Sequence, residues 1–96
     1  KVYFPNAFSP NGDNINDYFN LISDSSVERI DVLNIFDRWG DLLYEYHDFA
    51  PNGFQGAWDG NVNGQKALPG VYIYLFQFKD KAGDLHHLSG DLSLIR

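Results

Sequence analysis

Short apolar segments separated by turn-forming residues run along the whole chain. Six segments are rich in β-branched and aromatic residues, which favour strands: 2–4, 18–22, 27–36, 42–46, 71–78 and 85–95. Between them, Asn63-Gly64 is a favoured pair for a two-residue type I′ turn, and Gly40 stands where a hairpin needs positive φ. No segment has the periodicity of a long helix. The pattern predicts an all-β fold, an immunoglobulin-like antiparallel β-sandwich of about seven strands.

The pattern does not decide which face of segment 71–78 is buried. The segment 71–78 has an aromatic face and an aliphatic face, and only one of them must meet the opposing sheet. The other is either covered by another element, such as residues 49–58, or left as a surface for a partner or a sugar. Residues 48–67 form the longest irregular stretch. We expect Trp39 and Trp58 to tether loops to the core rather than to stack on sugars.

Length and composition indicate one folded module. With 96 residues, of which 44% are hydrophobic, the chain has room for a single small domain with a packed core. The chain starts at Lys1 without Met and ends at Arg96. We expect residues 1–96 to be one domain, cut from the C-terminal end of a larger secreted or surface protein.

Charge and residue usage argue against several classes of function. The formal net charge of −6 comes from eleven Asp and two Glu against four Lys and three Arg, with no basic cluster. Such a surface repels phosphate, so we expect neither nucleic-acid binding nor docking on an anionic membrane. Cysteine is absent, which excludes disulfides and thiolate sites. No apolar run approaches the roughly 18 residues of a membrane helix, so direct membrane insertion is not expected.

The residues that could catalyse a reaction do not form a recognisable site. His86 and His87 are adjacent, so on a strand they point to opposite faces. The third histidine, His47, has no recognisable partner, and no serine lies in a nucleophile motif. A carboxylate pair such as Asp13 and Asp17 would need a cleft that the sequence does not indicate. We therefore expect no enzyme activity.

The segment 11–17 concentrates oxygen-bearing side chains and allows two interpretations. Asn11-Gly12-Asp13-Asn14-Ile15-Asn16-Asp17 offers the hard ligands that Ca²⁺ prefers, which makes Asp13 and Asp17 candidate calcium ligands, with Asp59 as a further one. The spacing is not that of an EF-hand loop. Asn and Asp also cap backbone N–H groups in turns. A purely structural turn is the competing interpretation.

Several motifs occur together and in a fixed order. Segment 5–17 reads Pro-Asn-Ala-Phe-Ser-Pro-Asn-Gly-Asp-Asn-Ile-Asn-Asp, and it is followed by Asp-Arg-Trp-Gly at 37–40, Trp-Asp-Gly at 58–60, Leu-Pro-Gly-Val-Tyr-Ile-Tyr at 68–74 and a closing Leu-Ile-Arg. This order resembles the gliding-motility-associated C-terminal domain, the type B sorting domain of type IX secretion cargo in Bacteroidetes. The chain departs from the family pattern with Asn14 in place of Gly and Asp37 in place of Asn.

The resemblance implies a C-terminal address that directs its cargo through the type IX secretion system to the cell surface or medium, by way of the periplasm. The implied partner is the outer-membrane machinery, including a SprF/PorP-like protein. An address needs rigid displayed features. The candidate recognition residues are therefore Asn11, Gly12, Asp13, Asn16 and Asp17 of the segment 4–17, with Arg38, Asp59 and the terminal Arg96 as further polar candidates. The alternatives are an immunoglobulin-like adhesion or carbohydrate-binding module and a structural spacer.

Overall fold

The computed structural model describes residues 2–3, 7–10, 17–20, 22–23, 27–53 and 55–96. These residues contain nine strands and no helix. Four strands have eight to eleven residues, and the other five have two residues each. In chain order the strands are β1 Val2–Tyr3, β2 Ala7–Phe8, β3 Ile22–Ser23, β4 Val27–Phe36, β5 Leu42–Phe49, β6 Asn61–Val62, β7 Gln65–Lys66, β8 Gly70–Asp80 and β9 Leu85–Leu94.

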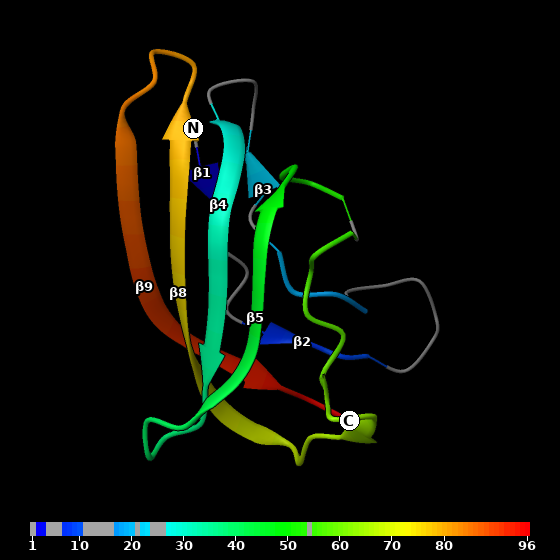
Figure 1. The fold of residues 1–96 in the computed structure, drawn as a ribbon. Helices are drawn as coiled ribbons and strands as arrows, with labels where there is room; N and C mark the ends of the chain where they lie inside the picture. The colour runs from blue at the N-terminus through cyan, green and yellow to red at the C-terminus, as the bar shows by residue number, and fades with distance from the viewer. Residues whose placement is uncertain (1, 4–6, 11–16, 21, 24–26, 54) are drawn as a thin grey trace.

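One curved sheet carries most of the fold, in the order β2-β9-β8-β4-β5 (Figure 1). The long strands pair antiparallel, with Leu33 opposite both Tyr46 and Phe76 in register. The short β2 runs parallel to β9, pairing Ala7 with Ser93. Two further ribbons, β1-β3 and β6-β7, complete the described strands.

The aromatic face of β8 is the one that the fold buries. Tyr72, Tyr74, Phe76 and Phe78 are all buried, whereas Val71 and Ile73 on the other face are exposed. Successive residues of a strand point to opposite faces, so the register fixes this division. Ile30, Leu33 and Ile35 of β4 join the same core.

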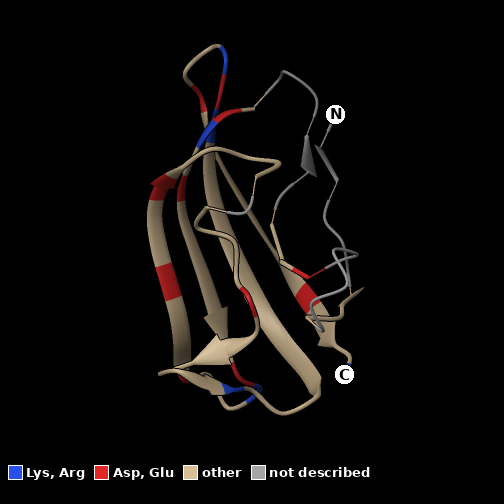
Figure 2. Cartoon of the chain, turned by 90° about the vertical axis from the view of Figure 1, so that its right-hand side faces the viewer, with Lys and Arg blue, Asp and Glu red and all other residues tan. Residues whose placement is uncertain are grey.

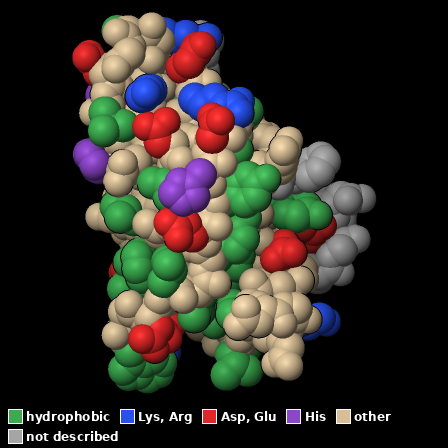
Figure 3. All heavy atoms as spheres, in the orientation of Figure 1, with side chains coloured by type: hydrophobic (Ala, Val, Ile, Leu, Met, Phe, Trp, Pro, Cys, Tyr) green, Lys and Arg blue, Asp and Glu red, His purple; other side chains and the backbone are tan. Residues whose placement is uncertain are grey.

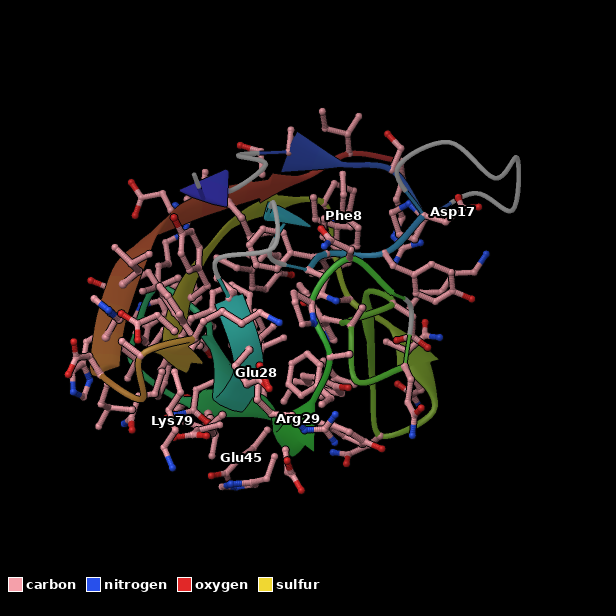
Figure 4. All side chains as sticks on the ribbon, turned by 90° about the horizontal axis from the view of Figure 1, so that it is seen from above. Phe8, Asp17, Glu28, Arg29, Glu45 and Lys79 are labelled. Atoms are coloured by element: carbon pink, nitrogen blue, oxygen red, sulfur yellow. The ribbon has the colours of Figure 1, made fainter. Side chains whose placement is uncertain are left out.

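The opposing layer is built from loop residues as well as from short strands. Phe19 and Trp58 form an isolated bridge, with reciprocal N–H···O bonds of 2.8 and 3.0 Å, and both side chains are fully buried. Their rings lie within 5.2 to 6.0 Å of Phe8, Tyr72, Tyr74 and Phe76, in the range where aromatic pairs attract. The view from above shows the sheet curving around this interior (Figure 4). The sandwich is therefore closed by aromatic contacts more than by a second broad sheet.

The all-β, sandwich-like fold confirms the expectation from the sequence. β4 has its predicted bounds, and Asn63 and Gly64 both have positive φ in the β6-β7 turn, as a type I′ turn requires. Two details differ. Within segment 18–22, Phe19 forms an isolated bridge with Trp58 and Ile22 begins β3, whereas Tyr18 and Asn20 belong to no strand. The β2–β9 pairing is parallel inside an otherwise antiparallel sheet.

Candidate functional site

The β4-β5 turn, residues 37–41, lies at the lower end of the sandwich in Figure 1. The Asp37 carboxylate accepts hydrogen bonds from the N–H groups of Trp39 and Asp41, both at 2.9 Å. Gly40 has φ 89°, where a side chain is disfavoured. The turn is thus held by its first and fourth residues. The two residues between them, Arg38 and Trp39, are free to face outward.

The β8-β9 turn, residues 80–84, repeats this construction at the upper end. Asp80 accepts hydrogen bonds from Ala82 N–H and Asp84 N–H at 2.9 Å, and Gly83 also has φ 89°. The sequences are Asp-Arg-Trp-Gly-Asp and Asp-Lys-Ala-Gly-Asp. The same turn therefore forms with Trp or with Ala at its third position.

Trp39 does not tether the turn to the core, contrary to the expectation from the sequence. Its side chain is 81% exposed, and the guanidinium of Arg38 lies 5.8 Å from the ring centroid. The turn extends past the ends of β4 and β5 (Figure 1). Trp58, in contrast, is fully buried and tethers its loop as expected.

The second feature of the lower end is the turn that follows Trp58. Trp58 Nε1 donates to Asn61 O at 3.0 Å, and the Asp59 carboxylate accepts from Asn61 N–H at 3.0 Å. Gly60 has φ 83°, and a Cβ there would lie 2.9 Å from the Pro10 ring. Hydrogen bonds within the turn therefore hold this corner, which we call the Trp58 corner, and Pro10 packs closely against it.

Arg96 fastens this corner to the end of the sheet. Its guanidinium donates to Gly60 O and its Nε to Ala67 O, each at 3.0 Å. Ala67 N–H also donates to Gly60 O at 2.8 Å, and Ile95 N–H donates to Phe8 O at 2.9 Å. The two Arg96 bonds and the Ile95 bond join residues that are far apart in sequence, so they connect the C-terminal end of the chain to the Trp58 corner and to β2.

Between the β4-β5 turn and the β6-β7 hairpin lies a groove of about 610 Å³. Its apolar lining includes Trp39, Leu68 and Val71, which are 81%, 78% and 45% exposed. Tyr72 also lines the groove, and burial, with a smaller contribution from Asp37, raises the pKa of its phenol, while Arg96 and Arg38 partly oppose that shift. Hydrophobic side chains project at this end in the space-filling view (Figure 3).

The basic residues that the structure describes gather at the two ends of the sandwich (Figure 2). At the upper end, Arg29 pairs with Asp48 at 2.6 Å and Lys81 with Glu28 at 3.3 Å. At the lower end, Arg38 and Lys66 line the groove. Among the described residues, neither has a carboxylate within ion-pair distance. Positive charge is therefore available to a ligand at the lower end.

The structure brings part of the predicted recognition set together. Arg38, Asp59 and Arg96 all lie at the lower end, Asp59 and Arg96 as supports of the Trp58 corner and Arg38 on the groove. Asn11, Gly12, Asp13 and Asn16 lie outside the described residues. Asp17, which follows them, is half-buried near Phe19 and is labelled in Figure 4.

Sequence reasoning named neither Leu68 nor Lys66 as a site residue, although both line the groove with Trp39. It did leave one face of segment 71–78 open as a surface for a partner, and Val71 lies on the aliphatic face. A further signal was the repeated Asp-x-x-Gly-Asp turn. Comparing its two copies shows that Trp39 is not required by the turn.

Within the described part of the chain, no group of three or more His, Asp or Glu side chains is placed to hold a metal ion. His47 and His86 each contact a carboxylate on the surface, Glu45 at 3.0 Å and Asp80 at 2.9 Å. In the same residues there is no helix that could cross a membrane. The candidate calcium ligand Asp13 is not among the described residues.

The sequence matches the model of a known protein family. The model of the CHU_C Type IX secretion signal domain matches residues 2–90, which include the Trp58 corner, the groove and both Asp-x-x-Gly-Asp turns. A search of curated proteins gave no match. Since the family match covers nearly the whole chain, the chain belongs to the CHU_C family and is a type IX secretion signal domain, the sorting signal that directs an attached cargo protein to the cell surface or medium.

Proposed function

We propose that this domain is a folded address, read as a three-dimensional surface by the outer-membrane part of the type IX machinery. The supporting observation is the extent of the family match, which runs from β1 into β9 and so spans a complete sandwich rather than a short tail. In this proposal the domain forms the C-terminal end of a longer cargo. The cargo enters the periplasm by an N-terminal Sec signal and is then presented to a SprF/PorP-like outer-membrane protein.

The domain performs no reaction in this proposal. Its contribution is a preformed shape, because groups that are already ordered lose little conformational entropy when a partner binds. The Arg96 bonds to Gly60 O and Ala67 O supply this order at the lower end. Arg38 acts as a contact residue, whereas Asp59 and Arg96 position the surface around it.

The polar residues Asn11, Gly12, Asp13, Asn16 and Asp17 are proposed as a second contact region. Pro10, which precedes them in the sequence, lies close to Gly60 of the Trp58 corner. Calcium at Asp13 and Asp17 stays a prediction. Thermal unfolding with added Ca²⁺ and with EDTA tests it, because bound calcium would raise the melting temperature and chelation would reverse that rise.

Export of a fluorescent cargo tests the proposal. The fusion carries an N-terminal Sec signal, a fluorescent protein and residues 1–96 at its C-terminus, in a Bacteroidetes host with and without a working type IX translocon. We expect surface or medium fluorescence only in the first strain, and its loss when the SprF/PorP-like gene is deleted. Retention in the periplasm of both strains, with the fusion folded, would contradict the proposal.

A further inference from the structure

The exposed Trp39 is unnecessary for the local fold. The two Asp-x-x-Gly-Asp turns share both carboxylate-capped N–H groups and the glycine φ of 89°, yet one carries Trp39 and the other Ala82. Trp39 is also absent from the buried core. The chain itself therefore shows what this turn needs, and a large aromatic side chain is not part of it.

Trp39 is one member of an apolar surface. Leu68 and Val71 are exposed on the same groove, so three large apolar side chains face one space at the lower end. Single exposed hydrophobic residues are ordinary, but contiguous ones mark interaction sites. Tryptophan is also among the residues that most often dominate binding energies at interfaces.

The charge around the groove indicates what it binds. Arg38 and Lys66 line it without an ion-pair partner among the described residues, in a chain whose net charge is −6. Asp37 also lines the groove and keeps its negative charge while its Oδ1 accepts the two N–H groups of the turn, so the charged side chains of the lining are two cations and one anion. Available cations beside an apolar surface complement a carboxylate next to an apolar side chain.

We propose that this groove binds a short protein segment of the type IX machinery in which an apolar side chain stands beside an Asp or Glu. The apolar side chain packs on Trp39, Leu68 and Val71, and the carboxylate pairs with Arg38. A neutral sugar could bond to Asn63 and Gln65, which also line the groove, but it fits less well because it would leave Arg38 without a carboxylate partner. This inference rests on the proposed function and names the surface through which it operates.

Matched variants at the two turns test the role in export. In the fluorescent fusion carrying residues 1–96, Trp39→Ala and Arg38→Glu change the groove, while Lys81→Glu changes the same position of the upper turn. We expect export to fall by about tenfold or more for the groove variants, the effect typical of losing an interface hot spot, and to stay near the wild-type level for Lys81→Glu. Because Trp39 is exposed and Ala82 serves the equivalent turn, thermal unfolding of Trp39→Ala should match that of the wild type.

Cross-linking then identifies the occupant. A photo-reactive amino acid at position 68 in exporting cells, with position 82 as control, should capture a machinery segment that contains an apolar residue beside Asp or Glu. Replacing that carboxylate by Lys should restore export of Arg38→Glu.

The outcomes separate this inference from the proposed function. If the wild-type fusion is not exported, the proposed function fails. If the wild type is exported and the folded groove variants are exported equally well, only the groove assignment fails. Cross-linking to a glycan, or to a segment without a carboxylate, would also overturn the groove assignment. So would a failure of the charge exchange to restore export of Arg38→Glu.

Discussion

Two aspartates at the ends of long strands, Asp37 after β4 and Asp80 at the end of β8, each stabilise the turn that follows. Asp37 and Asp80 occupy the first position of two turns of the same type, and each carboxylate accepts hydrogen bonds from two backbone N–H groups of its turn. Their surroundings differ, since His86 approaches Asp80 at 2.9 Å. The local chemistry of a carboxylate is therefore set by its cross-strand neighbours as well as by its turn.

Asp80 gives the fold a dependence on acidic pH. Its hydrogen bond with His86, and then those from the backbone N–H groups, lower its pKa below the ordinary 3.8. A lowered folded-state pKa stabilises the fold above the unfolded-state value, and this contribution is lost as the pH falls through the folded-state pKa. Urea unfolding between pH 5 and pH 2 should show a steeper loss of stability for the wild type than for Asp80→Asn. Equal slopes would mean that this carboxylate does not contribute.

Tyr44 gives an opposite dependence at alkaline pH. Burial, and secondarily the charge of Asp59, raise the pKa of its phenol to about 12 from 10.0. Because the folded-state pKa is the higher one, this contribution is complete below pH 10.0 and is lost as the pH rises toward 12. Its hydroxyl donates to Gly56 O at 2.9 Å.

Tyr44→Phe removes that hydrogen bond and should cost about 1 kcal/mol of unfolding free energy at neutral pH. The alkaline decline should also become shallower in the variant. Chemical denaturation at pH 7 and pH 11 measures both effects. A variant as stable as the wild type at pH 7, with an unchanged alkaline slope, would show that the hydroxyl is not held by the 50–60 loop.

At the scale of elements, the edge strand β5 is joined to the following loop by close packing. Gly56 has φ 83°, and a Cβ there would lie 2.6 Å from the ring of Phe49 and 2.7 Å from that of Tyr46. Both rings belong to β5 and stack edge to face with centroids 5.5 Å apart. The glycine lets the loop approach the strand closely enough for Trp58 to reach the core.

Gly56→Ala should destabilise the domain by about 2 to 4 kcal/mol, combining backbone strain with overpacking. Gly83→Ala is the matched control, since its φ is also positive but no atom lies within 4 Å of the added Cβ. It should cost only about 1 kcal/mol, from the backbone alone. Denaturant midpoints compare the two. Equal losses would mean that the contact with Phe49 relaxes freely.

At the scale of the whole molecule, the signal is a closed sandwich. β4 and β8 form the centre of the sheet, while Phe19 and Trp58 close the other side. A fragment that lacks β4 leaves the aromatic face of β8 without its neighbour. Loss of the fold should therefore also abolish export of the attached cargo.

A fluorescent fusion carrying only residues 61–96 should not be exported, although it keeps β8, β9 and Arg96. The full 1–96 fusion serves as the control, and immunoblotting of both fusions corrects export for the amount of protein. Export of the short fusion at the level of the full one would show that a linear segment suffices, which is incompatible with recognition of a folded surface.

The sequence determined the β class, the bounds of β4, the type I′ turn at Asn63-Gly64 and the family, because strand propensity and turn chemistry are local properties of a few adjacent residues. It also indicated Arg38, Asp59 and the terminal Arg96 as polar recognition candidates. Only the tertiary structure decided that Trp58 is buried and Trp39 exposed, that β2 runs parallel to β9, and that Leu68 and Val71 meet Trp39 in one groove. These outcomes depend on which distant segments pack together, and no local pattern records that.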